Sequence, residues 1–282
     1  MQHYFGAHID TFEDLIKPTE IVKNVGGNLV QIFMTLPGAQ KVTKYNTDEL
    51  LKYKKYLKDN EMKVVIHSSY IHNLARDWDH YSWWIKNLEI EIKYAHLIGA
   101  IGIVIHFGKK LELSTEEAYN NMFSSLLYIH NQTLEYKDVS IILETSTGQG
   151  TEVCFKIEDL AYFFNKFIKS DNKVIKDRFR ICIDTCHIFS AGYDIKTKNG
   201  VETYLQQFEN LIGLRYVKLI HLNDCKVDVG EHRDRHQNIG DGFIGITGLK
   251  HFFKYFKKLG VGIVLETPSD GYLKEIPKLL KF

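Results

Sequence analysis

The stretch that decides the fold is Val64-Val65-Ile66-His67, a run of β-branched residues that ends on an imidazole. Short apolar runs of similar composition recur along the chain. A short apolar run of this composition has the character of one buried strand. Eight such runs, separated by longer segments with helical periodicity, span residues 4–9, 29–34, 63–67, 102–106, 140–144, 180–184, 216–221 and 262–266. Strands that alternate with helices predict a parallel sheet built from βα units.

The segments between these strands have the apolar spacing of amphipathic helices. We predict helices over residues 48–60, 80–98, 115–136, 157–169, 202–211 and 247–259. Capping-box spacing marks the start of two of them, with Asn46 three residues before Glu49 and Ser114 three residues before Glu117. Eight βα units without a Pro- or Ser-rich linker predict an α/β fold, a single (β/α)8 TIM barrel domain over residues 1–282. A doubly wound sheet is the competing fold.

The composition is that of an ordinary core-forming protein. Hydrophobic residues make up 44% and charged residues 25%, which argues against a disordered or fibrous chain. The net charge of +1 excludes a uniformly basic surface but leaves room for a local site that attracts phosphate. There is no CxxC pair, no signal-peptide start and no apolar run long enough to cross a bilayer. We therefore expect a soluble intracellular protein, in the cytoplasm or nucleus, or in a virion if the source is viral.

Titratable side chains stand at the ends of six predicted strands, where barrel enzymes place their active sites. They are His67, His106, Glu144, Asp184, His221 and Glu266. His187 lies three residues after Asp184 as a strand turns into a loop, and Asp234 and His236 lie two apart on one face of an extended segment. A single polar residue at a strand end could be there only because the strand reaches water. Nine such residues, however, would all meet at the C-terminal end of one barrel. We expect His8 to lie beside this group.

Buried together, so many ionisable groups would repel or neutralise one another unless cations held them. A catalytic zinc ion takes about three protein ligands plus water, so nine ligands suit about three ions. Nitrogen and oxygen ligands without thiolate suit Zn²⁺ and also Mn²⁺ at one or more of the sites. Three divalent cations outweigh the four carboxylates and would attract a phosphodiester.

At these residues the chain resembles the endonuclease IV family of apurinic/apyrimidinic (AP) endonucleases, over nearly its whole length. The resemblance rests on Glu144-Thr145-Ser146-Thr147-Gly148-Gln149-Gly150, on Asp184-Thr185-Cys186-His187, and on His221-Leu222-Asn223-Asp224 followed by Asp234-Arg235-His236. The family has a TIM barrel with a trinuclear zinc site. By resemblance, the first ion is held by His67, His106 and Glu144, the second by Glu144, Asp184, His221 and Glu266, and the third by His187, Asp234 and His236.

The resemblance implies a zinc-dependent endonuclease of base excision repair that acts on double-stranded DNA. Such an enzyme hydrolyses the phosphodiester 5′ to an abasic site, leaving a 3′-hydroxyl and a 5′-deoxyribose phosphate, and we expect it also to remove 3′-blocking groups. Glu144 and Glu266 are the implied catalytic residues. The predicted DNA contacts are Tyr70, Ile71, Gln149 and Arg235. We expect a monomer. Residues 36–40 lack the arginine that the family often carries after its second strand.

Two alternatives belong to other functional classes. A sugar isomerase or epimerase on the same barrel would also collect Glu, Asp and His at strand ends, but it would have little use for the Asp234 and His236 pair. A non-catalytic DNA-damage binder descended from the enzyme would not need a complete set of ligands. The intact set therefore favours the endonuclease.

Overall fold

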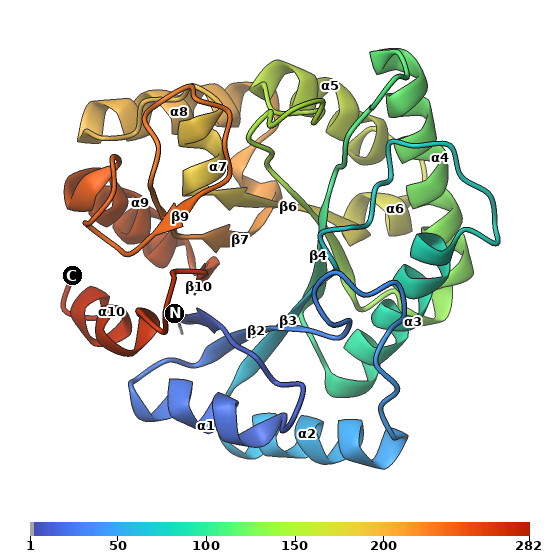
Figure 1. Cartoon of the computed structure of the whole chain (residues 1–282), viewed down its shortest axis with the longest axis horizontal. Coiled ribbons are helices and arrows are strands. Elements are labelled where there is room, and N and C mark those ends of the chain that lie inside the picture. Colours follow the sequence, from blue (N-terminus) through green and yellow to red (C-terminus); the bar gives the residue numbers. More distant parts are fainter. Residues whose placement is uncertain (1–2) are drawn as a thin grey trace.

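Residues 3–282, which the computed structural model describes, contain a closed barrel of eight parallel strands (Figure 1). The strands are β1 (Phe5–His8), β2 (Leu29–Phe33), β3 (Lys63–His67), β4 (Gly102–His106), β5 (Ser140–Glu144), β6 (Phe179–Asp184), β7 (Val217–His221) and β10 (Gly262–Leu265). They follow chain order around the barrel, and β10 pairs with β1 to close it. The predicted (β/α)8 barrel is confirmed, and the doubly wound sheet is excluded.

One layer of apolar side chains fills the inside of the barrel. It consists of Leu29, Val65, Val104, Ile142, Cys182, Leu219 and Val264, all of them fully buried. Because side chains alternate along a strand, the residue two positions after each of these points to the same interior, one layer nearer the C-terminal end. Those next residues include His67, Glu144 and Asp184. The strand register therefore places these predicted ligands directly above the buried apolar layer, on its C-terminal side.

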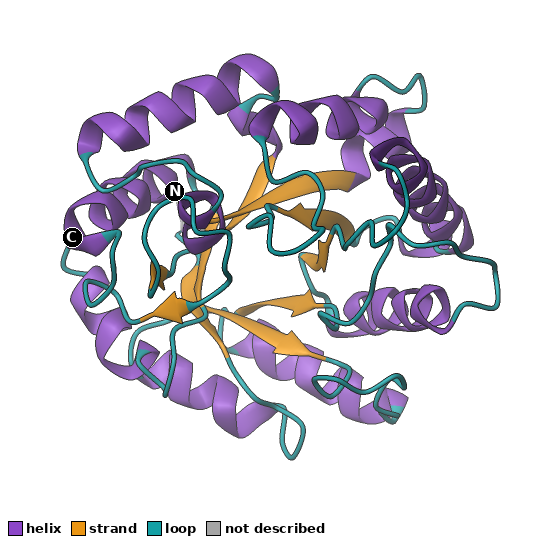
Figure 2. Cartoon of the chain, turned by 45° about the horizontal axis from the view of Figure 1, so that its top comes forward, coloured by secondary structure: helices purple, strands orange, loops and turns teal. Residues whose placement is uncertain are grey.

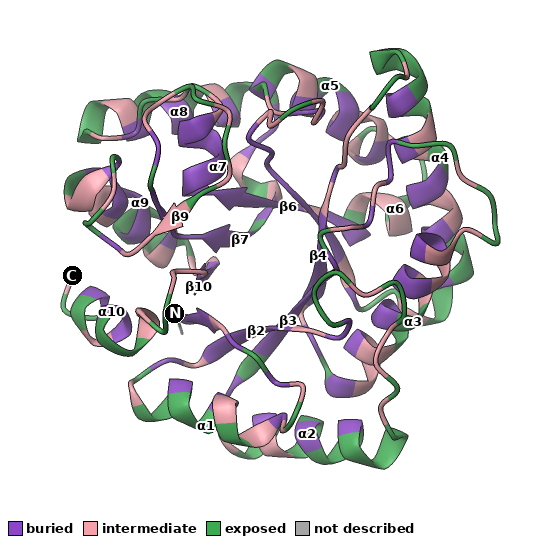
Figure 3. Ribbon diagram, in the orientation of Figure 1, coloured by how far each residue is buried: buried purple, intermediate pink, exposed green. Residues whose placement is uncertain are grey.

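Helices surround the barrel, as Figure 2 shows, and bury their inner faces against it, as Figure 3 shows. They are α1 (Ile16–Asn24), α2 (Thr47–Asp59), α3 (Trp83–Ile98), α4 (Thr115–Gln132), α5 (Ile157–Ile168), α6 (Lys173–Arg178), α7 (Thr185–Ser190), α8 (Lys198–Leu211), α9 (Gly245–Leu259) and α10 (Tyr272–Leu279). Single 3₁₀ turns, η1 (Leu134–Tyr136) and η2 (Leu214–Tyr216), precede β5 and β7. None of the helices in residues 3–282 is long and apolar enough to cross a membrane.

Of the two predicted capping boxes, one is formed completely and the other only in part. Ser114 and Glu117 form the reciprocal capping box at α4. At α2 the side chain of Asn46 accepts a hydrogen bond from the Asp48 amide, whereas Glu49 makes no return bond. The six predicted helices are present, but α1, α6, α7 and α10 were not predicted.

Residues 222–245, which have no strong hydrophobic periodicity and therefore predict one long loop, contain a short antiparallel ladder of β8 (Asp224–Cys225) and β9 (His236–Gln237). Two residues per strand are too few to leave a periodic signal in the sequence. β8 packs against α7, and Figure 1 shows β9 next to α7 and β7, on one side of the barrel. The ladder gives Asp234 and His236 a fixed backbone.

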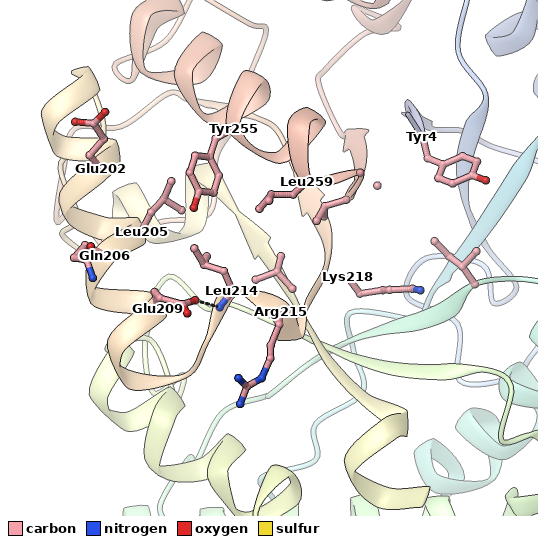
Figure 4. Close-up of a pocket in the computed structure, with 15 residues that line it drawn as sticks. Tyr4, Glu202, Leu205, Gln206, Glu209, Leu214, Arg215, Lys218, Tyr255 and Leu259 are labelled. Carbon is pink, nitrogen blue, oxygen red and sulfur yellow. Dashed lines mark hydrogen bonds between the residues drawn. The ribbon is translucent and has the colours of Figure 1, made fainter. Parts of the chain in front are cut away.

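A cavity of about 910 Å³ opens at the opposite, N-terminal end of the barrel (Figure 4). Apolar side chains of α8 and α9, among them Leu205, Tyr255 and Leu259, form its walls, and Lys218 lies on its floor beside Tyr4. None of the nine predicted ligands lines this cavity. The cavity is therefore separate from the site described next.

Candidate metal centre

The nine side chains predicted as ligands gather at the C-terminal end of the barrel. Five sets of three or four residues offer ligand atoms that lie within 4.8 Å of one another. Three of these sets are called here the first group, His67, His106 and Glu144, the second group, Glu144, Asp184, His221 and Glu266, and the third group, His187, Asp234 and His236. The other two sets overlap them, and they are His67 with His221 and Glu266, and Asp184 with Cys186 and His236. Glu144 belongs to the first and the second group. The assignment of ligands to particular ions, expected from the family resemblance, stays a prediction.

Glu144 lies at the centre of the site, as the last residue of β5. Its Oε2 atom is 3.1 Å from His67 Nε2 and 3.0 Å from His106 Nε2, and its Oε1 atom is 2.9 Å from His221 Nδ1. Burial opposes the charge of this carboxylate, but attraction to His106 and His221 outweighs burial and holds the pKa of Glu144 well below its usual range. Glu144 is therefore an ionised carboxylate with imidazoles on both oxygens.

The second group surrounds His221, the last residue of β7. Its Nδ1 atom is 3.2 Å from Glu266 Oε2 and 3.8 Å from Asp184 Oδ2. Burial opposes ionisation of Glu266, yet His221 and its neighbours lower the pKa of Glu266 to about 2. Burial likewise disfavours the charged form of His221, but the surrounding acidic groups raise the pKa of His221 well above its ordinary value. Positive charge is thus strongly favoured at the centre of this group.

The third group joins α7 to the segment before β9. Asp234 Oδ1 is 3.3 Å from both His187 Nε2 and His236 Nε2. Instead of the predicted loop, helix α7 follows Asp184, and Asp184 caps this helix by accepting a hydrogen bond of 2.9 Å from the His187 amide. The three-residue spacing therefore places both side chains on one side of the first helical turn.

Most of the imidazoles are oriented by a second contact on the ring nitrogen that faces away from the group. His67, His187 and His236 direct Nδ1 to the carbonyl oxygens of Ser68, Thr145 and Glu266, at 2.7, 2.8 and 3.2 Å. His221 is reversed, since its Nε2 is 2.8 Å from Gln31 Oε1. A donor bond on one nitrogen leaves the other free to bind a cation, which is how metal-binding histidines are held in proteins.

These residues fit a set of divalent cations. The Nε2 atoms of His187 and His236 are buried and have no hydrogen-bond partner. Buried polar atoms without a partner are rare and costly, and each of these two points at Asp234. Imidazole nitrogens and carboxylate oxygens are ligands for Zn²⁺ and Mn²⁺. An ion in each group would satisfy both the unpaired nitrogens and the excess of carboxylates.

Two buried amides that sequence reasoning missed hold the carboxylates in place. Gln31 Nε2 donates to Glu266 Oε1 at 2.6 Å, while Asn223 Nδ2 donates to Asp184 Oδ2 at 2.7 Å and Asn223 Oδ1 accepts from the Glu266 amide at 2.8 Å. Gln31 follows Leu29 of the interior layer by two residues, so strand alternation carried a signal for it. His8 lies 3.7 Å from Glu266, beside the ligands as expected.

Asp224 organises the segment that carries Asp234 and His236. Its fully buried carboxylate accepts hydrogen bonds from five backbone amides, those of Cys225, Gly240, Gly242, Ile244 and Gly245. A side chain at Gly242 would place its Cβ atom 2.4 Å from the Cys225 carbonyl oxygen, so only glycine fits there. Asp224 stands in a stretch that carries the family resemblance, but the sequence does not indicate its role, because its partners are backbone groups.

The four predicted DNA contacts surround the same end of the barrel. Tyr70 and Ile71 lie in the turn after β3, and Tyr70 is 56% exposed. Arg235 is exposed between Asp234 and His236. Gln149 has a structural role that was not expected, since its Oε1 accepts a hydrogen bond of 3.0 Å from the Asp234 amide. All four DNA contacts stay predictions.

The chain is similar in sequence and in fold to proteins that are already known. Residues 19–281 match the xylose isomerase-like TIM barrel family. A putative endonuclease 4 of Acanthamoeba polyphaga mimivirus is 32% identical over 273 residues, or 94% of this chain and 86% of that protein. A probable endonuclease 4 of Mycoplasma mobile is 36% identical over 269 residues, or 91% and 89%. The crystal structure of endonuclease IV from Thermus thermophilus superimposes with a TM-score of 0.83 at 23% identity, over 99% of both chains. The chain therefore belongs to the endonuclease IV family of xylose isomerase-like TIM barrels.

Proposed function

We propose that this chain is a single-domain, monomeric AP endonuclease of base excision repair inside the cell. It would hydrolyse the phosphodiester 5′ to an abasic site in double-stranded DNA, leaving a 3′-hydroxyl and a 5′-deoxyribose phosphate, and would also remove 3′-blocking groups. The observation that carries the proposal is the presence of three adjoining ligand groups around Glu144, in a chain whose relatives are called endonuclease 4.

The proposed cofactors are three Zn²⁺ ions, with Mn²⁺ as an alternative at one or more positions. His67, His106 and Glu144 would hold the first ion, Glu144, Asp184, His221 and Glu266 the second, and His187, Asp234 and His236 the third. The chemistry that bound divalent cations supply at such a site is activation of water near neutral pH and neutralisation of phosphate charge.

The two proposed catalytic carboxylates differ in their access to substrate. Glu144 is enclosed by imidazoles, and only 1% of its side chain is exposed. Its proposed role is therefore to bind cations rather than to contact substrate. The Glu266 side chain is 15% exposed, so water can reach it. Its pKa of about 2 makes it an ionised but weakly basic carboxylate. Access to water is therefore what favours Glu266 over Glu144 for a part in proton transfer during hydrolysis, while Gln31 and Asn223 fix its two oxygens.

The proposed DNA contacts divide into two kinds. Tyr70 and Ile71, in the exposed turn after β3, would enter the base stack where a base is missing, which costs less than displacing an intact nucleotide. Arg235 would bind a phosphate, because its neighbours Asp234 and His236 hold its backbone at the edge of the third group. Gln149 would contact DNA through its amide nitrogen, since its oxygen is bonded to Asp234.

A sugar isomerase remains the second candidate because it shares the barrel. The discriminating feature is the third group, His187, Asp234 and His236. It adjoins the second group through the 3.5 Å contact between His236 and Asp184, and Glu144, which the other two groups share, through the 3.3 Å contact with His187. An isomerase needs one or two cations, whereas hydrolysis of a phosphodiester benefits from several positive charges around the phosphate.

The test uses duplex DNA with one abasic analogue, and a second duplex with a blocked 3′ end at a nick. Bound metal is measured on the same protein, and each reaction is repeated after treatment with a strong chelator. We expect about three bound ions and chelator-sensitive nicking on the 5′ side of the lesion. Glu144→Gln should abolish nicking and lose metal, whereas Glu112→Gln, at an exposed position, should keep both. Sugar isomerisation without nicking would exclude the proposal.

A further inference from the structure

Two cysteines face each other directly behind the third ligand group. Cys186 belongs to α7 and Cys225 to β8, and their sulfur atoms are 3.2 Å apart in the thiol form. Both side chains are fully buried. No other two cysteine sulfurs in residues 3–282 make such a contact, since Cys154 and Cys182 lie apart from this pair in the packing around the barrel and inside it. The fold thus brings together one particular pair of thiols.

The separation is close to that of a disulfide. A disulfide bond is about 2.05 Å long, so the sulfurs need to approach by about 1.1 Å. The two side chains already point at each other, and α7 packs directly against β8. Rotation about the two Cα–Cβ bonds can supply a movement of this size without unfolding either element.

The position of the pair connects it to the ligands. Cys186 lies between Asp184 and His187 in the sequence, and Cys225 is the cross-strand partner of His236 in the ladder of β8 and β9. The ligand atoms of Asp184, Cys186 and His236 lie within 4.8 Å of one another. A covalent bond between the two cysteines would therefore join the helix that bears His187 to the hairpin that bears His236.

We propose that Cys186 and Cys225 are a site of reversible oxidation by peroxides, at which an intramolecular disulfide fastens α7 to the hairpin of β8 and β9. One thiol sulfur attacks a peroxide oxygen, which breaks the O–O bond and gives a sulfenic acid and one water. The second thiol sulfur then displaces the sulfenic hydroxyl, which leaves with the thiol hydrogen as a second water. Two thiols are oxidised and one hydrogen peroxide is reduced to two waters, and a dithiol reductant reverses the change.

Burial determines which oxidants can react. Because neither sulfur is exposed, a bulky disulfide such as oxidised glutathione has no direct approach to them in the folded protein. Hydrogen peroxide is close to water in size and can reach the pair during small openings of residues 222–245. The pair is thus selective for a small oxidant.

The disulfide should slow the loss of a cation from the third group. An ion held by His187, Asp234 and His236 leaves when α7 and the hairpin move apart, and the bond between Cys186 and Cys225 opposes that movement. This consequence rests on the proposed function, whereas the formation of the disulfide does not.

The experiment treats the purified, metal-bearing protein with hydrogen peroxide, alkylates the remaining thiols under denaturing conditions and maps the peptides by mass spectrometry. We expect the four free thiols to fall to two, with one cross-linked peptide joining Cys186 to Cys225. Cys154→Ala should give the same cross-link, whereas Cys225→Ser and Cys225→Ala should give none. Oxidised glutathione should leave all four thiols free in the wild type.

Two further measurements test the consequence. The oxidised protein should melt about 5 °C higher than the reduced protein, because the bond closes a loop of roughly 40 residues. One of the bound ions should be extracted by chelator at least threefold more slowly after oxidation, and Cys225→Ser should show no such change. Alkylation of both Cys186 and Cys225 after peroxide treatment, or a cross-link to Cys154 or Cys182, would overturn the proposal. If the cross-link between Cys186 and Cys225 formed in protein that binds no metal, the proposed oxidation site would still stand. Only the proposed metal centre would then be excluded.

Discussion

At the scale of single residues, Gln31 determines which nitrogen of His221 faces the ligand group. Its Oε1 atom accepts from His221 Nε2, and its Nε2 atom donates to Glu266, so one buried amide orients two ligands. We expect Gln31→Leu to lower the affinity for one metal ion by about 10- to 100-fold, as for other residues that support metal ligands. Competition with a chromogenic chelator measures this affinity. Gln206→Leu on exposed α8 is the control, and equal affinities in the two variants would contradict the role of Gln31.

Glu91 is a second buried residue with measurable consequences, although it lies outside the site. It belongs to α3, and its Oε1 atom accepts a hydrogen bond from Thr35 in the segment after β2. Its Oε2 atom is buried without a partner. Burial raises the pKa of Glu91 to about 8, with a smaller opposing effect from Thr35.

The raised pKa predicts a particular pH dependence of stability. Between about pH 4.5 and 8 the unfolded carboxyl is ionised while the folded one keeps its proton, so the unfolded state binds fewer protons and stability falls as pH rises. The slope from this group approaches about 1.4 kcal/mol per pH unit. Glu91→Gln should remove it, so that the variant gains stability relative to the wild type from pH 5 to 8 in urea unfolding. If the free energies of unfolding of the two proteins differed by the same amount at every pH in that range, Glu91 would not titrate in this way.

At the scale of elements, the segment of residues 222–245 depends on one carboxylate. Asp224 bonds the amides at both ends of the segment, including Cys225 and Gly245. Asp224→Asn replaces one acceptor oxygen with a donor that faces those same amides, so we expect faster hydrogen exchange across residues 236–245 and weaker metal binding at His236. Hydrogen exchange followed by mass spectrometry measures the effect. Asp241→Asn, at an exposed position of the same segment, should leave the exchange pattern as it is.

The turn after β3 makes a different prediction, about specificity. Tyr70 is exposed and makes no hydrogen bond through its hydroxyl within residues 3–282, so its removal should not disturb the fold. Tyr70→Ala should reduce the preference for abasic over intact duplex DNA by roughly 10-fold, in line with about 1–3 kcal/mol for a stacking side chain. Fluorescence anisotropy with both duplexes measures the preference. Tyr81→Ala, at another exposed tyrosine, is the control, and an unchanged ratio for Tyr70→Ala would assign the DNA contact elsewhere.

The elements show where sequence reasoning succeeds. Strands such as β3 and β4 could be predicted because their apolar runs are fully buried and end on an imidazole. Helices α6 and α7 could not, because six residues are too short for a periodic pattern, and α10 contains Pro277. The site follows the same division, since six of the nine predicted ligands lie at the ends of barrel strands, whereas Asn223 acts through contacts with residues distant in sequence.

At the scale of the whole molecule, four carboxylates in one small space make the fold sensitive to the loss of cations. An ion at 100 times its Kd stabilises the folded state by about 2.7 kcal/mol, provided that the unfolded chain does not bind it. We expect a strong chelator to lower the melting temperature by at least about 5 °C, and excess Zn²⁺ to restore it. Differential scanning calorimetry is the measurement. Identical melting curves with and without chelator would argue against structural cations at this site.

The pairing of β1 with β10 joins the first and last strands of the barrel, and Glu266 follows directly after β10. During synthesis on the ribosome, the barrel therefore stays open until β10 has emerged. A polypeptide that ends before β10 lacks Glu266 and leaves one edge of β1 unpaired, because β1 then pairs with β2 alone. Premature termination before β10 should thus yield inert fragments rather than a nuclease with an incomplete site.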